Sequence, residues 1–521
     1  MFRALRHLGA LVRIGWHLAR HDALFPLRNI VGLTPFLRVA RWVRPPAEVV
    51  LGLREGQRLA LALRQLGPSF IKLGQALSTR SDLIGEEVAA DLSTLQDNVP
   101  PFPGAQAVAV IEAEMGMPLA QRFCRFDEVA IAAASVAQVH FATTTEGAEV
   151  AVKVLRPGVE QAFARDLDLL LWLAEQLERF QAMRRLKPVE VVGRLAESVA
   201  FEMDLRLEAS AAAELAENFA KDPDFRVPSV DWLRTGRRVL VTERIHGIPV
   251  GDREALLAAG LEPKEIVRKA AAAFFAMVFR DGFFHADLHP GNLFVGLDGA
   301  IVAVDFGIMG RLDRKHRFYL ADMLLGFLTG NYRQVAQVHF DAGFVPASES
   351  IDAFTQACRS IGEPLMGQPL EKISVARLLS QLFQITRTFK METQPQLLML
   401  QKTMVLAEGL GRILDPSVNM WSLSRPLVED WMAINRSGPA RALLTVGDAL
   451  AGLERLPAMM GDFERLLRQL SHGGLSLDAE TVRAIRGDGG HRNPMIWPLW
   501  IAALALAAMA IAQLVAAAHS V

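Results

Sequence analysis

The spacing of hydrophobic residues changes several times along the chain, and each change predicts a different kind of secondary structure. Residues 45–120 and 160–220 show the spacing of amphipathic helices, the first stretch with a break at the proline-rich 98–104 (NVPPFPG). Between them, 134–144 (ASVAQVHFATT) and 149–157 (EVAVKVLRP) alternate as the two strands of a hairpin do. The pattern therefore predicts helices, then a β-hairpin, then helices again.

Two further apolar segments are short and favour strands. They are 237–247 (RRVLVTERIHG) and 301–307 (IVAVDFG), and from about residue 312 to 475 the spacing is almost entirely helical. A small sheet-bearing lobe followed by a larger helical lobe is an α+β arrangement. We expect six regions: a basic amphipathic segment 1–48, a helical extension 49–120, a small lobe 121–250, a helical lobe 251–420, a helical tail 421–494 and an apolar span 495–518.

The N-terminal segment is strongly basic. Asp22 is the only acidic residue among residues 1–44, where arginines alternate with hydrophobic residues at helical spacing, namely Phe2, Leu5, Leu8, Val12 and Trp16. A basic amphipathic helix of this kind binds an anionic membrane surface. Two alternatives stay open: a helix packed on the protein with solvated arginines, and a mitochondrial transit peptide, which the absence of serine disfavours.

Residues 495–518 (MIWPLWIAALALAAMAIAQLVAAA) carry no charge, and Gln513 is their only polar side chain. A helix needs about 20 apolar residues to cross a bilayer, and Trp497 and Trp500 mark one end, where indoles favour the interface. Arginines precede this segment and no Lys or Arg follows it, so the positive-inside rule places the main body in the cytoplasm. We expect a single C-terminal transmembrane helix; a buried soluble helix is the alternative.

The overall composition excludes some classes of protein. The 521 residues have a formal net charge of −1, so the whole chain lacks the basic excess that is typical of nucleic-acid binding. The two cysteines, Cys124 and Cys358, are far apart and form neither a disulfide framework nor a zinc motif, which fits a reducing compartment. We therefore expect no nucleic-acid partner.

Residues 285–292 (HADLHPGN) hold more polar chemistry than a turn requires. Proline and glycine suffice for the turn, whereas Asp287 and Asn292 place a carboxylate and an amide five residues apart. Asp305 follows an apolar strand and begins Asp-Phe-Gly, and Lys153 lies in the middle of an earlier strand. A helical stretch between them carries three carboxylates, Glu202, Asp204 and Glu208. Each residue alone is commonly a solvated charge, but their order resembles the protein-kinase series V-A-I-K, H-R-D-x-x-x-x-N and D-F-G.

Phosphoryl transfer assigns a task to each member of this set. Lys153 would hold the phosphates of ATP or ADP and would itself be held by a glutamate of the helical stretch. Asn292 and Asp305 would ligate Mg²⁺, a hard cation that prefers oxygen ligands. Asp287 would orient the attacking hydroxyl or water.

Two stretches depart from the protein-kinase pattern. No G-x-G-x-x-G precedes the Lys153 strand, and the loop that would cover the phosphates is a run of small residues, Ala132, Ala133, Ala134 and Ser135. Alanine has a Cβ and approaches a phosphate less closely than glycine does. Further upstream, Lys72 and Gln75 share a helix face because they are three residues apart. An ordinary turn and a solvated helix edge are the respective alternatives.

Together these motifs resemble the UbiB family of atypical kinase-like proteins, the ADCK-type branch. The resemblance runs from about residue 50 to residue 420. It rests on K-x-G-Q at 72–75, the Ala-rich loop at 132–135, E-x-D at 202–204, H-A-D-L-H-P-G-N at 285–292 and D-F-G at 305–307. Two positions depart from the family pattern: Gly85 stands where the family often has Pro, and Ala211 stands where it has Asn.

The resemblance implies a two-lobed protein-kinase-like fold whose N-terminal extension covers the cleft. Lys72 and Gln75 would point at the nucleotide, and Glu202 and Asp204 would meet the extension. Glu208 would be the partner of Lys153, which makes Asp287, Lys153 and Glu208 the expected catalytic residues.

The resemblance also implies a function and a location. The expected activity is that of a Mg²⁺-dependent ATPase or atypical kinase that supports ubiquinone biosynthesis at the bacterial inner membrane. Its expected partners are membrane lipids, prenylated phenol or quinone precursors and the enzymes that act on them. Two alternatives stay open: a phosphotransferase acting on a lipid or small molecule, and a non-catalytic scaffold that senses nucleotide.

Overall fold

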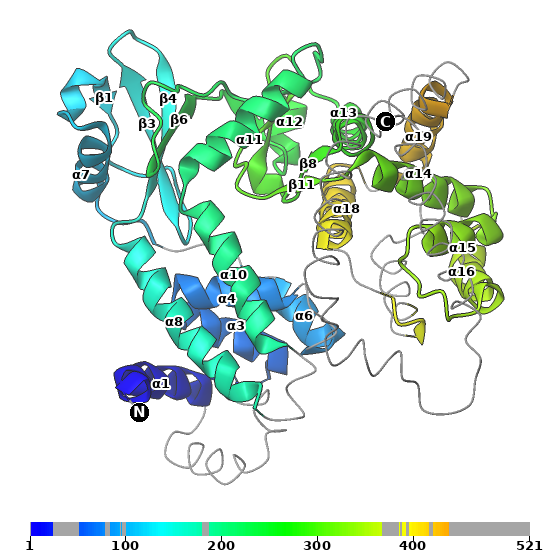
Figure 1. The fold of residues 1–521 in the computed structure, drawn as a ribbon. Coiled ribbons are helices and arrows are strands. Elements are labelled where there is room, and N and C mark those ends of the chain that lie inside the picture. Colours follow the sequence, from blue (N-terminus) through cyan, green and yellow to red (C-terminus); the bar gives the residue numbers. More distant parts are fainter. Residues whose placement is uncertain are drawn as a thin grey trace, which may run out of the picture. The chain divides into compact units, whose positions relative to one another are not determined.

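The fold is known from a computed structural model, which describes residues 2–23, 50, 52–78, 84–93, 95, 100–179, 187–366, 385, 388–391, 395–415 and 420–436 (Figure 1). Helices predominate in this part of the chain, and its strands form three separate sheets. The α+β class that the hydrophobic pattern predicts is confirmed.

An antiparallel sheet forms the small lobe. Its strands are β1 (Phe123–Phe126), β2 (Ala132–Ala133), β3 (Ala137–Thr144), β4 (Glu149–Leu155) and β6 (Val239–Glu243). They follow the order β1-β3-β4-β6, with β2 also paired to β3, so the predicted hairpin is β3–β4. Val150, Val152 and Val154 of β4 pack with Ile111 of α7 (Gly104–Met115) in one apolar core. Side chains alternate along a strand, so Lys153 points to the opposite face.

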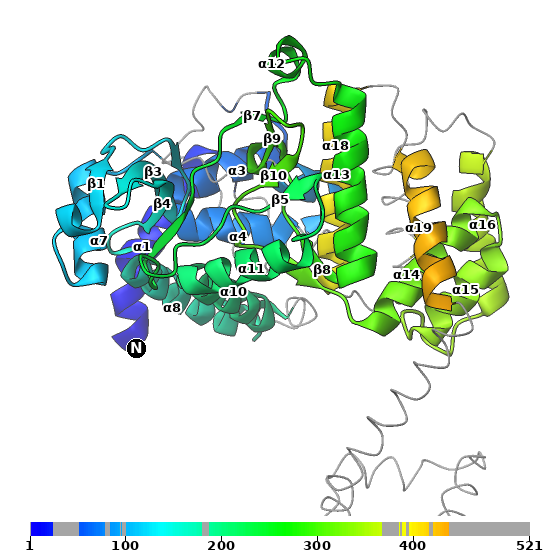
Figure 2. The ribbon, with the colours of Figure 1, turned by 90° about the horizontal axis from the view of Figure 1, so that it is seen from above.

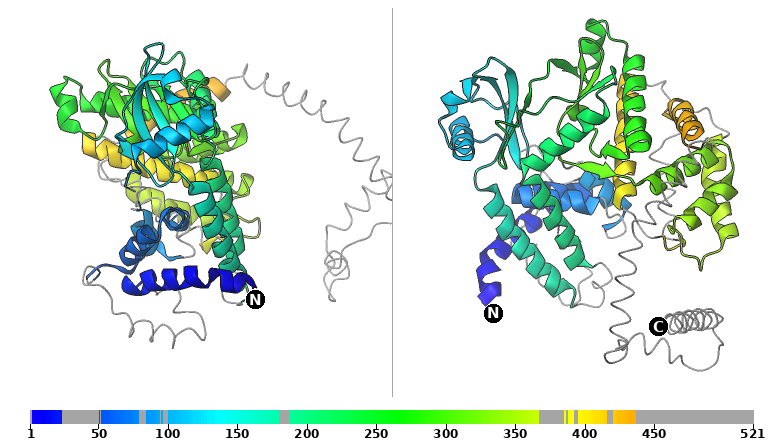
Figure 3. Two further views of the ribbon diagram at one scale, coloured as in Figure 1. Left: turned by 90° about the vertical axis from the view of Figure 1, so that its left-hand side faces the viewer. Right: turned by 45° about the horizontal axis from the view of Figure 1, so that its top comes forward.

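The extension and the helices after the hairpin share a second apolar core. These helices are α3 (Glu55–Leu66), α4 (Pro68–Ser78), α6 (Glu86–Ser93), α8 (Val159–Leu177), α10 (Pro188–Glu202) and α11 (Leu205–Asn218). Leu59 and Phe70 of the extension pack in one core with Phe163 and Leu195. The helices α8 and α10 lie side by side (Figures 1 and 3). Gly85, just before α6, has a φ of 85°, a conformation that the proline ring forbids.

The N-terminal helix α1 (Phe2–Arg20) packs on α3. Ala19 is buried, and Nε2 of His7 lies 3.3 Å from Oδ2 of Asp168 on α8. In contrast, Val12 and Trp16 are 63% and 47% exposed. The contacts agree with the interpretation of a helix packed on the protein, and membrane binding through the exposed residues stays a prediction.

Two small sheets lie within the larger lobe. Strands β5 (Phe225–Arg226), β10 (Ile301–Ala303), β9 (Leu293–Gly296) and β7 (Gly247–Pro249) form one sheet in that order, and β8 (Phe283–His285) pairs with β11 (Met309–Arg311). The strands predicted within 237–247 and 301–307 are β6 and β10. Short turns also occur among the described residues, namely the 3-10 turns Leu119–Gln121 and Pro290–Asn292 and the π-helical turn Ala276–Asp281.

Helices make up the rest of the larger lobe among the described residues, and those after residue 312 agree with the helical spacing predicted there. They are α12 (Arg253–Ala258), α13 (Pro263–Phe275), α14 (Arg314–Leu328), α15 (Tyr332–Asp341), α16 (Ile351–Met366), α18 (Pro395–Leu414) and α19 (Met420–Arg436). The helices α13 and α18 lie side by side (Figure 2). Phe274 and Met277 share a core there with Leu410, so α18 is anchored to the lobe that carries residues 285–292, the predicted catalytic loop.

The membrane prediction concerns a different part of the chain. Among the residues described, no helix combines the length and the apolar character needed to span a bilayer. The predicted span 495–518 and the part of the tail 421–494 that follows Arg436 lie outside the described residues. The transmembrane helix therefore stays a prediction.

Candidate active site

Lys153, Glu208 and Asp305 are far apart in the sequence but form one charge cluster. The Lys153 ammonium donates to both carboxylate oxygens of Glu208, at 2.7 Å to Oε1 and 2.9 Å to Oε2. It also donates to Oδ1 of Asp305 at 2.9 Å. The lysine comes from β4, the glutamate from α11 and the aspartate from the segment after β10. The cluster therefore joins the two lobes.

Local backbone geometry directs each side chain toward the cluster. Lys153 faces away from the core between β4 and α7. Glu208 lies in the first turn of α11, whose N-terminus is capped by Asp204. Asp305 has a φ of 62°, a left-handed conformation that costs a non-glycine residue roughly 1–2 kcal/mol. Strained backbone of this kind persists where the surrounding structure holds it, often at functional sites.

The two carboxylates and the ammonium shift one another's pKa. Burial alone would lower the pKa of Lys153, but the charges of Asp305 and Glu208 outweigh it and raise that pKa, so the lysine stays charged. The Lys153 ammonium lowers the pKa of Asp305 well below its usual range, although the Asp305 side chain is 48% exposed. Burial of Glu208, helped by the Asp305 charge, raises the pKa of Glu208 to about 7 against the opposing effect of Lys153. A further cation would relieve the excess negative charge.

The backbone of Asp287 is held by its own loop. Its amide donates to Nδ1 of His285 at 3.1 Å, and its carbonyl accepts from the His289 amide at 2.8 Å and from Nδ2 of Asn292 at 3.1 Å. His285 is fully buried with Nε2 3.2 Å from the Val304 carbonyl, and burial lowers its pKa, so the ring is neutral. These contacts fix the point at which the Asp287 side chain leaves the loop.

Asn292 and Asp305 lie at adjoining ends of paired strands. Asn292 directly precedes β9, Asp305 follows β10, and the Val304 amide donates to the Asn292 carbonyl at 2.9 Å. Because Nδ2 of Asn292 is bound to the Asp287 carbonyl, its Oδ1 remains for a cation. Within the described ranges, no three His, Cys, Asp or Glu side chains form a metal cage. The pair fits Mg²⁺ bound together with phosphate oxygens, which is the usual way Mg²⁺ is held.

Lys402 is a residue of the site that the motifs did not predict. It lies on α18, and its Nζ donates to Oδ1 of Asp287 at 2.7 Å. The only signal in the sequence is that Lys402 is the one basic residue between Pro395 and Gly411. A lone lysine on a helix is usually a solvated surface charge, so the pattern could not distinguish it.

The predicted phosphate-covering loop is in part a strand. Ala132 and Ala133 form β2 and pair with β3, the neighbour of β4, so only Ala134 and Ser135 lie in the turn. The Ala134 carbonyl accepts from Nε of Arg156 at 2.9 Å, and Ser135 is fully buried. The expectation of a four-residue loop is therefore wrong for its first half, because the cross-strand pairing holds those two alanines extended.

The K-x-G-Q extension is joined to the helix that precedes α11. Nζ of Lys72 on α4 lies 3.0 Å from Oε2 of Glu202 at the end of α10, and both side chains are largely buried. Gln75 donates to the Leu95 carbonyl at 3.1 Å, within the extension itself. Asp204, expected to meet the extension, instead caps α11 and binds the arginine two residues on, at 2.6 Å. A carboxylate at this position satisfies the free amides of the first helical turn.

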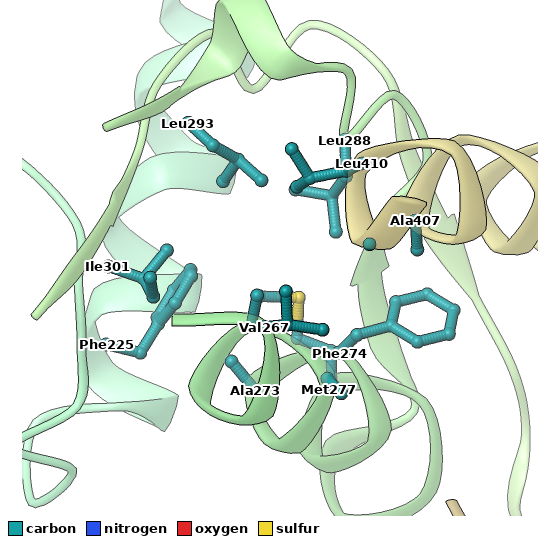
Figure 4. A pocket seen from close by; sticks show the side chains of 13 residues that line it. Phe225, Val267, Ala273, Phe274, Met277, Leu288, Leu293, Ile301, Ala407 and Leu410 are labelled. Atoms are coloured by element: carbon teal, nitrogen blue, oxygen red, sulfur yellow. The ribbon is translucent and has the colours of Figure 1, made fainter. Parts of the chain in front are cut away.

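A small apolar cavity of about 30 Å³ lies between α13, α18 and the strands next to the catalytic loop (Figure 4). Leu288, which directly follows Asp287, lines it together with Phe274, Met277 and Leu410. A cavity of this volume is large enough for a water molecule, but a water needs polar partners that the lining does not offer. The cavity is a gap in packing, and the polar chemistry of the site lies in the charge cluster and the loop.

Comparison with known proteins agrees with these motifs. Two family models match, the ABC1 atypical kinase-like domain at residues 94–339 and the UbiB helical domain at 358–419. A protein of Marinobacter nauticus named "Probable protein kinase UbiB" is 42% identical, over 97% of this chain and 94% of its own length. One of the same name from Pseudomonas putida is 42% identical, over 93% and 90%.

A solved structure is also similar, "The complex structure of Rv3197-erythromycin from Mycobacterium tuberculosis". It is 26% identical, covers 68% of this chain and 90% of its own, and has a TM-score of 0.45. The extent and identity of the curated relatives, together with the two matching family models, show that the chain belongs to the UbiB family of atypical kinase-like proteins.

Proposed function

We propose that this protein binds Mg²⁺ and ATP and hydrolyses ATP slowly by kinase-type phosphoryl transfer. The observation that carries the proposal is the Lys153 ammonium bound to Glu208 at 2.7 Å and to Asp305 at 2.9 Å. Catalysis of phosphoryl transfer consists mainly of positioning and of electrostatic stabilisation of the phosphates. A charged lysine that is held from two sides meets the second requirement.

Each residue of the site has one task in this proposal. Lys153 holds phosphate oxygens, Glu208 keeps that lysine oriented, and Asp287 accepts a hydrogen bond from the attacking water. Asn292 and Asp305 supply oxygen ligands for Mg²⁺. Once bound, Mg²⁺ neutralises the charge that develops on the phosphates. The β2–β3 turn, next to the strand of Lys153, covers the phosphates.

The Lys72–Glu202 ion pair supports water as the acceptor. It ties the extension to the end of α10, immediately before the helix that carries Glu208. An extension held there limits the approach of a protein hydroxyl more than that of water. The Lys72 and Glu202 side chains are largely shielded from water. This shielding strengthens the attraction between them, because charges interact more strongly in a less polar medium.

The biological role rests on the family and on the terminal segments. We place the activity in ubiquinone biosynthesis because the chain belongs to the UbiB family. The uncharged span 495–518 and the basic N-terminal helix suit a protein anchored at the bacterial inner membrane with its main body in the cytoplasm. Prenylated phenol or quinone precursors, and the enzymes that act on them, are the clients that this location favours.

The test is phosphate release from Mg-ATP by the full-length protein in anionic liposomes. Wild type is compared with Asp305→Asn and with Asp352→Asn, an exposed carboxylate on α16 paired with Arg333. We expect slow release by wild type, a loss of about 100-fold or more in Asp305→Asn, and no change in Asp352→Asn. Addition of EDTA should abolish the release.

Two outcomes would replace this proposal. With γ-labelled ATP, label that appears in an extracted lipid or small molecule instead of free phosphate would identify a phosphotransferase. Nucleotide binding without any release, equal in wild type and in Asp305→Asn, would identify a nucleotide-sensing scaffold.

A further inference from the structure

The contact between Lys402 and Asp287 joins two parts of the chain that match different family models. Asp287 lies in the kinase-like match, 94–339, and Lys402 lies in the helical-domain match, 358–419. Nζ of Lys402 is 2.7 Å from Oδ1 of Asp287, the distance of a charge-assisted hydrogen bond. The helical domain therefore contributes a charged group directly to the catalytic loop.

The backbone of Asp287 is hydrogen-bonded within its own loop, whereas its side chain is bound by a residue from outside the loop. Its amide and carbonyl are bound by His285, His289 and Asn292 of the same loop. The carboxylate oxygen Oδ2 lies 3.9 Å from Nε2 of His289, which is too far for a hydrogen bond. Among the described residues, the hydrogen bond to the Asp287 carboxylate comes from Lys402 through Oδ1, and Oδ2 forms none.

The H-R-D pattern of protein kinases has an arginine before the aspartate, and this chain has Ala286 there, 1% exposed. The loop itself therefore offers no permanent cation next to Asp287. Lys402 supplies that charge from a helix, across 115 residues of sequence.

The helix that carries Lys402 is well fixed. Leu400, Leu410 and Leu414 of α18 are buried in the core of the catalytic lobe, and α18 contacts α13 and β11. Thr403, next to Lys402, is fully buried and donates to the Met399 carbonyl at 2.9 Å. A lysine side chain is flexible, but its Cα is held here by the packing of its neighbours. Precise placement of a catalytic group on a rigid element matters, because a misplacement of about 1 Å costs about 100-fold in rate.

We propose that Lys402 is a positioning residue for the phosphoryl transfer proposed above, on which this inference rests. Its ammonium binds Oδ1 of Asp287 and thereby turns Oδ2 toward the attacking water or hydroxyl. Turnover then depends on the helical domain as well as on the kinase-like domain. Nucleotide binding, which is assigned to the Lys153 cluster, does not depend on Lys402.

The test measures kcat and the KM for Mg-ATP in phosphate release by the full-length protein in anionic liposomes. For Lys402→Met we expect kcat to fall about 30- to 100-fold while KM changes less than about 3-fold, because the carboxylate loses its orientation but the nucleotide site is intact. Lys402→Arg, which keeps the charge, should have a kcat about 10-fold higher than that of Lys402→Met. The matched control is Arg412→Met, which removes the Arg412–Glu408 ion pair from the same helix and should leave kcat within about 2-fold.

A double-mutant cycle separates positioning from a structural effect. When Asp287 is already replaced by Asn, the additional Lys402→Met substitution should lower kcat by less than about 3-fold, because the carboxylate that Lys402 positions is already absent. Melting temperatures are measured for all variants. If Lys402→Met does not fold, Lys402→Gln, which keeps a donor without the charge, takes its place with the same criteria.

The outcomes distinguish this inference from the proposed function. Wild-type release together with a Lys402→Met kcat within about 3-fold of wild type overturns the role of Lys402 and leaves the ATPase proposal intact. An equal loss in Lys402→Met and Lys402→Arg that tracks their melting temperatures assigns Lys402 a structural role only, and also overturns it. Nucleotide binding without release in wild type overturns the ATPase proposal and this inference with it.

Discussion

Two lysines reach carboxylates of the candidate site from opposite lobes, and their surroundings differ. Lys153 comes from a strand of the small lobe, is 20% exposed and binds both Glu208 and Asp305. Lys402 comes from a helix of the larger lobe, is 48% exposed and, among the described residues, pairs with the single carboxylate of Asp287. Charges interact more strongly when water is excluded, so the Lys153 cluster is the more strongly coupled of the two.

Enclosed and exposed lysines suit different tasks. An enclosed lysine between two carboxylates keeps its charge and its place whether or not a ligand is present. A half-exposed lysine on a single carboxylate holds an orientation at little electrostatic cost and leaves the second oxygen accessible. We therefore expect loss of Lys153 to damage nucleotide binding and turnover together, and loss of Lys402 to damage turnover alone.

Lys153→Met should reduce activity more than any other substitution considered. It removes the phosphate-binding charge and leaves Glu208 and Asp305 without their shared cation. We expect kcat/KM for Mg-ATP to fall about 1000-fold or more, with nucleotide affinity reduced as well, and stability to fall by about 3 kcal/mol as in other broken buried pairs. Phosphate release, nucleotide titration and thermal unfolding measure the three quantities.

A lysine outside the cluster provides the control for Lys153→Met. Lys269 is also enclosed, 16% exposed, and its Nζ lies 2.8 Å from Asp224. Lys269→Met should lower stability without affecting nucleotide affinity. Equal kinetic losses in the two variants would show that the Lys153 cluster is no more than a structural link between the lobes.

Much of the fold and of the Lys153 cluster could be predicted, because local patterns specify them. The alternation around Lys153 predicts one strand of a hairpin, and the structure has β4 paired with β3; the packing of β4 on α7 is added by the fold. Asp287, Asn292 and Asp305 follow strands or turns of recognisable composition. Their order along the chain identified residues that the fold brings close together, although no single motif was sufficient.

The contacts that could not be predicted have no local signature. The Lys402–Asp287 contact spans 115 residues, and nothing in the residues next to Lys402 identifies its partner. Asp204 was expected to meet the extension, yet helix capping, a local interaction, determines its place. Ala132 and Ala133 were expected in a loop, and only pairing with β3 makes them a strand.

A smaller effect, on stability, is expected from Glu208→Gln. In the metal-free protein the pKa of Glu208 is raised to about 7 from 4.5. Between these two pH values the folded protein keeps a proton on Glu208 that the unfolded chain has already released. Binding of this proton contributes to the stability of the folded state. That contribution to stability is complete below about pH 4.5 and is lost as the pH rises through 7. It amounts to at most about 3 kcal/mol. The glutamine does not titrate, so between pH 5 and 8 the variant should gain stability relative to wild type.

Thermal unfolding in EDTA at several pH values measures this difference. Glu214→Gln is the control, because it removes a carboxylate from the same helix that pairs with Arg311 instead of Lys153. A wild-type to Glu208→Gln difference that stays constant from pH 5 to 8 would contradict the raised pKa. It would mean that Lys153 keeps both Glu208 and Asp305 ionised, and that repulsion between these two carboxylates is too weak to raise the pKa of Glu208.

The smallest kinetic effect is expected from Leu410→Ala, and it examines how firmly α18 presents Lys402. Leu410 is 4% exposed and lines the apolar cavity next to the catalytic loop. Truncation enlarges that cavity and should cost about 2–4 kcal/mol of stability. Because Lys402 lies two turns away, we expect only a 3- to 5-fold fall in kcat, with the KM for Mg-ATP unchanged.

Ile361→Ala on α16, also buried, should cause a comparable loss of stability with kcat unaltered. If the two variants lose kcat equally, core packing of α18 does not control Lys402, and the exposed lysine acts as a flexible side chain that finds Asp287 without help from its helix.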